Sequence, residues 1–330
     1  MTEDTIRFEI DGRTVEAAPG ETIWTVAQRA GIEIPHLCHR PEPGYEPDGN
    51  CRACMVQVEG ERALAASCIR KPTDGMKVSV SAERARKSRE MVFELLIADQ
   101  PKRETSHDPT SQFWQWADKV GVDGTRFPER EQWQADTSHP AMAVNLDACI
   151  HCNLCVRACR DVQVNDVIGM ANRGADAKVV FDFDDPMGES TCVACGECVQ
   201  ACPTGALMES ALLDAQQTRT EWPDKQVASV CPYCGVGCQV TYNVKQNRII
   251  SVDGRNGPAN EQRLCVKGRF GTDYSRHPHR LSVPLIRRDD APKRGDDKVD
   301  PDTPWTHFRE ASWEEALEAA AGGLSRIRDR

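Results

Sequence analysis

The sequence predicts a modular α+β chain in which several small domains are each organised around metal. Sixteen cysteines fall into four sets of four, with none left over. Hydrophobic residues make up 39% of the 330 residues, which is slightly few for one large core but suits small metal-centred domains. Segments with strand alternation and segments with helical periodicity follow one another along the chain. A chain of this length is expected to hold more than one domain.

The composition also limits the compartment and the partners. The first ten residues, MTEDTIRFEI, show no basic segment, apolar segment or twin arginine of an export signal, and no apolar run reaches the length of a membrane span. In a reducing cytoplasm, cysteines are held as metal-bound thiolates and not as disulfides. The net charge of −10 argues against nucleic acid as a main partner. We therefore expect a cytoplasmic, metal-binding protein.

Residues 1–81 are predicted to form the first domain. A β-hairpin is indicated by the alternating segments IRFEI and RTVEAA on either side of the turn DG. The segment ETIWTVAQRAG then predicts a helix capped by Thr22 and ended by Gly31, and CMVQVEG and MKVSV predict further strands. This is the element order of a β-grasp ferredoxin. The first cysteine set follows the predicted helix and consists of Cys38, Cys51, Cys54 and Cys68.

Residues 82–139 are predicted to be a helical linker, and residues 140–222 carry two cysteine runs. Each run reads C-x2-C-x2-C-x3-C, and the second ends in CPTGA with proline after its last cysteine. This is the run of a bacterial two-cluster 4Fe–4S ferredoxin. Zinc is the alternative for four thiolates, but zinc sites use paired C-x2-C units with a long gap between them. The two sets are Cys149, Cys152, Cys155 and Cys159, then Cys192, Cys195, Cys198 and Cys202.

The last cysteines of the two runs are expected to exchange. In two-cluster ferredoxins the fourth cysteine of each run ligates the other cluster. Cys202 would therefore complete the first cluster and Cys159 the second. Arg160 stands after Cys159 where a simple ferredoxin has proline. The gap between the runs is long and contains the strand-like segment AKVVFDF.

Residues 223–330 contain a fourth set with a different spacing, C-x2-C-x3-C-x26-C. The altered third gap indicates a change of module. An amphipathic helix is predicted within ASWEEALEAAAGGLSRIRDR at the end of the sequence. The fourth set consists of Cys231, Cys234, Cys238 and Cys265.

The first half of the chain resembles a known electron-transfer arm. GNCRACMVQVEG, ALAASC and DGMKVSV are similar to the 2Fe–2S domain of the large NADH-side subunit of respiratory complex I and of related hydrogenases and formate dehydrogenases. In those relatives a helical segment carries a further cluster on the pattern H-x3-C-x2-C-x5-C. Here His107 keeps the histidine position, but Ser111, Trp114 and Val120 replace the cysteines. We expect this cluster to be absent, the tryptophans to fill its volume, and His107 to be a surface or capping residue.

The last part of the chain resembles the start of a molybdenum- or tungsten-bis-pterin oxidoreductase domain. VCPYCGVGCQV, LCVKGRFG, HPHRLSVPLIRR and SWEEALEAA match that family in order. The resemblance implies a 4Fe–4S cluster at the fourth set. It also implies that Lys267, two residues after Cys265, lies between cluster and pterin as an electron relay; a solvated lysine is the alternative. The catalytic residues of that family lie beyond Arg330, so the sequence names no acid, base or nucleophile.

Taken together, the chain resembles the N-terminal part of the α subunit of a cytoplasmic NAD-dependent formate dehydrogenase. This implies one 2Fe–2S cluster, three 4Fe–4S clusters and a molybdenum or tungsten bis-molybdopterin guanine dinucleotide, with FMN and NAD on a diaphorase-type partner subunit. The implied reaction is oxidation of formate to carbon dioxide. The alternatives are an electron-transfer subunit of complex I or of an NAD-linked hydrogenase, and an assimilatory nitrate reductase, which shares CPYCGVGC but not the ferredoxin arm.

Overall fold

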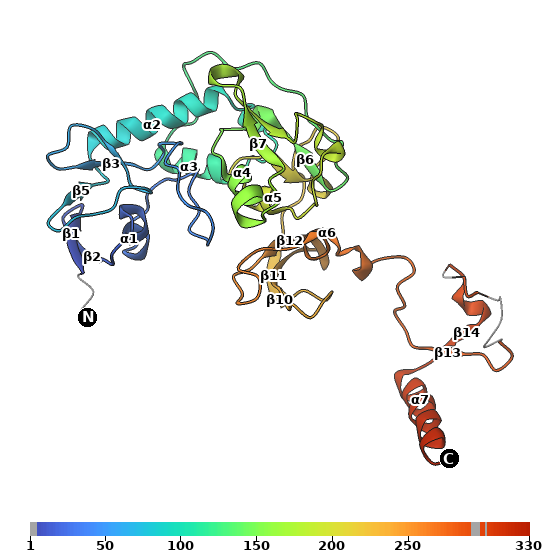
Figure 1. Ribbon diagram of the computed structural model, residues 1–330. Coiled ribbons are helices and arrows are strands. Elements are labelled where there is room, and N and C mark those ends of the chain that lie inside the picture. Colours follow the sequence, from blue (N-terminus) through green and yellow to red (C-terminus); the bar gives the residue numbers. More distant parts are fainter. Residues whose placement is uncertain (1–4, 292–297, 301) are drawn as a thin grey trace. The chain divides into compact units, whose positions relative to one another are not determined.

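The computed structural model describes residues 5–291, 298–300 and 302–330 (Figure 1). The chain divides into two compact units, Met1–Phe270 and Gly271–Arg330. The predicted modular α+β class is confirmed, because the strands and helices of the described residues are short and form several separate cores. Among the described residues, no helix combines the length and the apolar character that crossing a membrane requires.

A five-stranded sheet forms the first domain, in the order β2-β1-β5-β3-β4. The predicted hairpin is present, and its turn uses the left-handed backbone of Asp11 (φ 47°) and Gly12 (φ 78°). Strand β1 also pairs in parallel with β5, and the helix α1 begins after Thr22, whose side chain accepts from the Thr25 N–H at 3.2 Å. The elements are β1 Ile6–Ile10, β2 Arg13–Ala17, α1 Ile23–Arg29, β3 Met55–Val58, β4 Ala65–Ala66 and β5 Lys77–Ser79.

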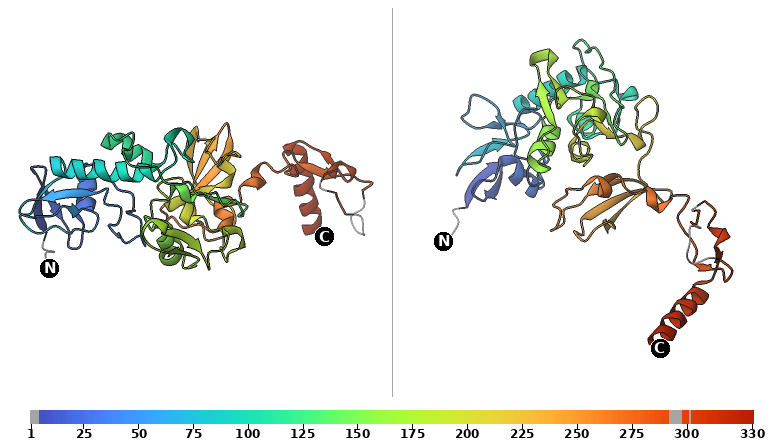
Figure 2. Two further views of the ribbon diagram at one scale, coloured as in Figure 1. Left: turned by 90° about the horizontal axis from the view of Figure 1, so that it is seen from above. Right: turned by 45° about the vertical axis from the view of Figure 1, so that its right-hand side comes forward.

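Two helices, α2 (Glu83–Ala98) and α3 (Gln112–Val120), form the linker. In Figures 1 and 2, α2 runs from the β-grasp sheet toward the ferredoxin runs. At the sheet, the buried Arg89 donates to the Met55 carbonyl at 2.9 Å. Trp114 and Trp116 of α3 are buried with Phe93 and Phe113 in a core of their own. These two tryptophans are therefore part of the packed core of the linker, whereas Trp133 is 36% exposed.

The ferredoxin region is built from short elements around one core, and all the cysteines of both runs except Cys195 belong to this core or pack against it. Strands β6 and β9 pair across more than sixty residues of sequence, and β7 and β8 form a hairpin in the long gap between the runs. A single π-helical turn, Ala158–Val162, follows α4. The elements are β6 Met142–Val144, α4 Leu154–Arg157, β7 Ile168–Ala171, β8 Lys178–Phe181, α5 Glu197–Ala201 and β9 Leu207–Glu209.

A three-stranded antiparallel sheet, β10-β11-β12, ends the first unit and carries the fourth cysteine set. Its core is small and consists of Val240, Val252 and Leu264. The elements are β10 Lys225–Val230, β11 Gln239–Lys245, β12 Arg248–Gly254 and α6 Val266–Phe270.

The second unit contains a two-stranded sheet and one long helix. Strand β13 (Leu285–Arg287) pairs antiparallel with β14 (Phe308–Glu310). The predicted amphipathic helix is α7 (Trp313–Arg328), and the Ser312 side chain caps it by accepting from the Glu315 N–H at 3.1 Å. The apolar side chains of α7 are exposed within this unit, at 70% for Trp313.

Candidate iron–sulfur sites

The first cysteine set gathers beside the β-grasp sheet. Cys38, Cys54 and Cys68 are buried, and Cys51 is half-buried. The Sγ atoms of Cys54 and Cys68 lie 3.4 Å apart, and the Cys51 N–H points at the Cys38 Sγ at 3.5 Å. Hydrogen bonds from Cys51 and Cys68 lower the pKa of the Cys38 thiol. The structure thus brings all four predicted ligands of this set together.

Left-handed backbone shapes the loop of this first set. Gly49 (φ 63°) and Arg52 (φ 59°) both adopt it next to Cys51. A Cβ on Gly49 would also meet the end of the Ile69 side chain at 2.9 Å, but it is the left-handed backbone that favours glycine here. Arg52 is exposed.

The two ferredoxin runs repeat one backbone conformation. The residue before the second cysteine is left-handed in both, His151 at φ 52° and Ala194 at φ 54°. The N–H of each donates to the first cysteine Sγ of its run, at 3.5 Å and 3.4 Å. The residue after the second cysteine is left-handed too, Asn153 at φ 60° and Gly196 at φ 71°. Main-chain N–H groups aimed at sulfur are the donors that stabilise an iron–sulfur cluster.

The structure places the last cysteine of each run beside the other run. Burial and, to a smaller extent, the neighbouring Cys202 raise the pKa of Cys149 to about 11. In the second run, burial likewise raises the pKa of Cys192, and the neighbouring Cys159 adds to this effect. The same neighbours act on the other cysteines of each run: Cys202 on Cys152 and Cys155, and Cys159 on Cys195 and Cys198. This placement is what an exchange of fourth ligands requires.

The fourth set lies on the loop between β10 and β11 and at the start of α6. The Cys231 N–H donates to the Cys238 carbonyl at 2.8 Å, which closes the loop. Burial and the neighbouring Cys231, Cys234 and Cys265 raise the pKa of Cys238, so the four thiols lie near one another. Cys234 and Cys265 are exposed. Lys267 is also exposed, on α6 two residues after Cys265.

The donor sets suit clusters held by four thiolates. All sixteen cysteines are free thiols. The first and fourth sets are each gathered at one place, and the two ferredoxin runs share one core. In the first three sets a main-chain N–H points at a cysteine sulfur. Within the described residues, no group of three or more histidine, cysteine, aspartate or glutamate side chains is arranged to hold a single metal ion.

The expectation for His107 was wrong. Its ring is buried, with 8% exposed, and is neither a surface residue nor a helix cap. Nε2 lies 2.8 Å from a carboxylate oxygen of Asp147, and Nδ1 lies 2.6 Å from the Gln217 carbonyl. Burial alone would lower the pKa of His107, but the hydrogen bond and charge of Asp147 outweigh it and the pKa is raised. His107 therefore holds the linker against the ferredoxin region.

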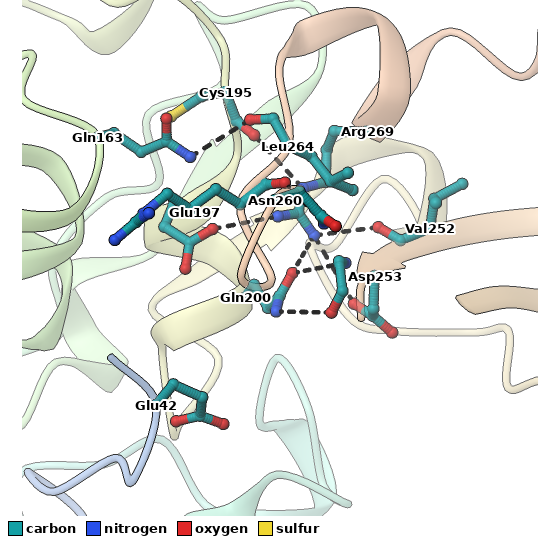
Figure 3. Close-up of polar contacts among 12 residues, drawn as sticks. Glu42, Gln163, Cys195, Glu197, Gln200, Val252, Asp253, Asn260, Leu264 and Arg269 are labelled. Carbon is teal, nitrogen blue, oxygen red and sulfur yellow. Dashed lines mark hydrogen bonds and ion pairs between the residues drawn. The ribbon is translucent and has the colours of Figure 1, made fainter. Parts of the chain in front are cut away.

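Sequence reasoning missed two buried arginines that contact the cysteine sets. Arg157 lies in the first run, and Arg269 lies on α6, four residues after Cys265. Figure 3 shows Arg269 among Cys195, Glu197 and Gln200 of the second run. The sequence did contain one signal for Arg269. The second run has Glu197 before its third cysteine, where the first run has Leu154. A charged residue at a position that is apolar in its repeat predicts a buried partner of opposite charge.

Three family models match the chain in succession. They are a 2Fe-2S iron-sulfur cluster binding domain over residues 3–83, a 4Fe-4S dicluster domain over residues 148–206, and a molybdopterin oxidoreductase Fe4S4 domain over residues 224–277. Together they cover all four cysteine sets. Three separate segments of the chain are therefore similar to iron–sulfur domains. They correspond in turn to the first sheet, the ferredoxin region and the sheet of β10 to β12.

Whole proteins are also similar to the chain. An NADH-quinone oxidoreductase subunit of Rhizobium meliloti is 32% identical, over 86% of this chain and 33% of the relative. A putative formate dehydrogenase of Bacillus subtilis, YrhE, is 28% identical over 100% of this chain and 36% of the relative. A chain from the crystal structure of an NAD+-reducing [NiFe]-hydrogenase in the H2-reduced state has a TM-score of 0.56 and 28% identity, over 62% of this chain and 88% of that one. The chain spans about a third of the length of the curated relatives it matches.

Proposed function

We propose that this chain, the iron–sulfur region of a molybdopterin oxidoreductase or NADH-quinone oxidoreductase type of protein, carries electrons between a metal–pterin centre and a flavin subunit that reduces NAD. The observation that carries the proposal is the gathering of sixteen cysteines into four separate sets of four. Each set has the spacing of a cluster site, and the last one lies in a molybdopterin oxidoreductase Fe4S4 domain.

We assign one cluster to each place where four cysteines gather. A 2Fe–2S cluster is proposed at the first set, and two 4Fe–4S clusters are proposed at the two ferredoxin runs with their fourth ligands exchanged. The close approach of Cys202 to the first run and of Cys159 to the second supports this exchange. A third 4Fe–4S cluster is proposed at the set that ends in Cys265. When bound, these clusters accept and release single electrons, and the chain supplies ligands, spacing and tuning.

Formate is the substrate we propose for the complete protein. Support comes from the putative formate dehydrogenase of Bacillus subtilis, which matches the full length of this chain. Electrons from formate would leave a molybdenum or tungsten bis-molybdopterin guanine dinucleotide, pass the fourth set, the ferredoxin runs and the first set, and reach FMN and NAD on a partner subunit. Lys267 is proposed as a relay beside the fourth set, and no residue of this chain is proposed as a catalytic acid, base or nucleophile.

A second candidate function is electron transfer within a complex I type of assembly. It is favoured by the NADH-quinone oxidoreductase relative of Rhizobium meliloti, whose identity of 32% exceeds that of the putative formate dehydrogenase. In this case the clusters would carry electrons that come from NADH, and formate would not be oxidised. The similarity to the hydrogenase chain supports a series of iron–sulfur clusters in both cases. It does not favour formate or NADH as the source of the electrons.

One experiment separates the two candidates. The complete protein is purified anaerobically with its partners, its molybdenum and tungsten are quantified, and reduction of its clusters by formate is followed by absorbance. We expect a stoichiometric metal and bleaching of the brown colour by formate. Bleaching by NADH together with no response to formate and no molybdenum or tungsten would favour the complex I type instead. A colourless protein without iron would overturn both.

A further inference from the structure

Two buried arginines lie where one cysteine set meets the next. Arg157, in the first ferredoxin run, reaches toward the β-grasp loop, and Arg269, on the helix after Cys265, reaches toward the second run. Only 4% of the Arg157 side chain and 1% of the Arg269 side chain are exposed. Arginine is rarely buried unless it is paired, so each must have a structural or electrostatic reason to be there.

Arg269 is fully engaged by the second run and by β12. Its Nε donates to the main-chain carbonyl of Cys195 at 3.3 Å, and one terminal nitrogen donates to the Val252 carbonyl at 3.0 Å and to the Gln200 side chain (Figure 3). The other terminal nitrogen lies 3.4 Å from the Glu197 carboxylate. On the helix that carries Arg269, a Cβ at Gly268 would lie 3.6 Å from the Cys231 Sγ. Arg269 therefore connects Cys195, in the second ferredoxin run, with helix α6, which lies beside the fourth cysteine set.

The second run is adapted to receive this side chain. A Cβ on Gly196 would lie 2.8 Å from the Arg269 Cγ, and the equivalent residue of the first run is Asn153. The next residue, Glu197, is 2% exposed and also accepts from the Tyr45 hydroxyl at 2.8 Å, whereas the first run has Leu154 there. The glycine admits the arginine, and the glutamate neutralises its buried charge.

Arg157 makes corresponding contacts between the first cysteine set and the first ferredoxin run. One of its terminal nitrogens donates to the carbonyl of Cys38 at 2.7 Å and to the carbonyl of Cys152 at 3.3 Å. The other donates to the Glu46 carbonyl, and Nε lies 3.4 Å from the carboxylate of Asp48. A single guanidinium thus bonds to one cysteine of the first set and to one of the second.

We propose that Arg157 and Arg269 are positioning residues that clamp successive clusters together and set their reduction potentials. This rests on the proposed function, since it presumes clusters at these sets. A fixed positive charge at low exposure stabilises an added electron, because neither water nor salt screens it well. Arg269 should therefore raise the potential of the cluster at the second run, Glu197 should lower it, and Arg157 should raise the potentials of the first two clusters.

The test is a redox titration of the full protein, purified anaerobically and followed by electron paramagnetic resonance. We expect Arg269→Met to lower the midpoint potential of the second-run cluster and Glu197→Gln to raise it, with the first-run cluster unchanged in both. We expect Arg269→Lys, which keeps the charge, to restore most of the potential. Arg157→Met should lower the potentials of the 2Fe–2S and first-run clusters and leave the second-run cluster unchanged.

Arg160→Met is the matched control, because Arg160 follows Cys159 directly but 53% of its side chain is exposed. It should shift no potential. The inference is overturned if Arg269→Met and Glu197→Gln shift the second-run potential in the same direction, or not at all. If Arg269→Met loses iron, the other two variants serve as the test. The inference is then overturned if Glu197→Gln fails to raise the second-run potential or if Arg269→Lys does not keep most of the wild-type potential. Absence of iron–sulfur signals from the wild-type protein would instead overturn the proposed function.

Discussion

At the scale of single residues, Cys159 and Cys202 test the proposed exchange of ligands between the two ferredoxin clusters. Each is the last cysteine of its own run, yet each lies close enough to the other run to raise the pKa of a cysteine there. We expect Cys159→Ser to perturb the cluster of the second run and to spare the first-run cluster. Electron paramagnetic resonance of the two clusters checks this. A variant that damages the first-run cluster and leaves the second intact would show that the ligands do not exchange.

Lys267 gives a second prediction at this scale. Lys267→Met keeps the length of the side chain and removes its charge, so packing losses should be small. If the charge stabilises electrons between the fourth set and the pterin, formate-dependent NAD reduction should fall by about tenfold or more, equivalent to about 1.4 kcal/mol on the barrier. NADH-dependent dye reduction should survive, because that route ends at the flavin.

The iron and molybdenum or tungsten contents separate the possible causes. Both should match the wild type if Lys267 acts as a relay. Loss of iron together with both activities would make Lys267 a structural residue. Unchanged formate turnover would support the alternative of a solvated lysine, which agrees with its exposure in this chain.

The cysteine sets could be picked out from the sequence, but the buried polar residues around them could not. Cysteine spacing names a cluster site directly, because the cluster fixes the separation of its ligands. His107 could not be placed in the same way: its partner Asp147 lies forty residues away and becomes a neighbour only through tertiary packing. Arg269 was missed for a similar reason, since its contacts with Cys195 and Glu197 cross more than seventy residues.

At the scale of elements, glycine at the start of α5 tests the packing of the second run. Gly196→Ala places a Cβ in left-handed backbone and 2.8 Å from Arg269, whereas Gly174 has nearly the same φ, 68° against 71°, and no atom within 4 Å of an added Cβ. Left-handed backbone alone costs a non-glycine residue about 1–2 kcal/mol. We expect Gly174→Ala to lower the unfolding free energy by about that amount and Gly196→Ala by more.

Anaerobic chemical denaturation measures the difference between these two variants. Equal losses of unfolding free energy would show that Arg269 moves aside without cost. A larger loss for Gly196→Ala, together with a changed midpoint potential at the second-run cluster, would show that the close approach of Arg269 to Gly196 affects that cluster.

Elements with local signals were predicted well, and those formed by distant pairing were not. The hairpin of β1 and β2 and the helices α1 and α7 follow from alternation, capping and periodicity. The pairing of β6 with β9 escaped prediction, because three-residue strands far apart in sequence carry no pattern of their own. The sheet of β10 to β12 was not predicted either, although its strands are longer and pair with their neighbours in sequence.

At the scale of the whole molecule, the cysteine sets are distributed over several separate hydrophobic cores. The described residues form four small cores, and cysteines belong to or border each of them. Because small cores stabilise a chain only modestly, cluster binding should contribute strongly to folding. A hydrophobic content of 39% suits several small cores better than one large one.

The iron content tests the molecule as a unit. One 2Fe–2S and three 4Fe–4S clusters require about fourteen iron atoms per chain. The segment that holds a further cluster in the relatives carries Ser111, Trp114 and Val120 here, and in the structure the first two are buried against packed side chains. No thiolate is present at these positions to bind iron. Iron analysis of anaerobically purified protein should therefore give a value near fourteen, and a value near eighteen would show that His107 and other ligands bind a fifth cluster.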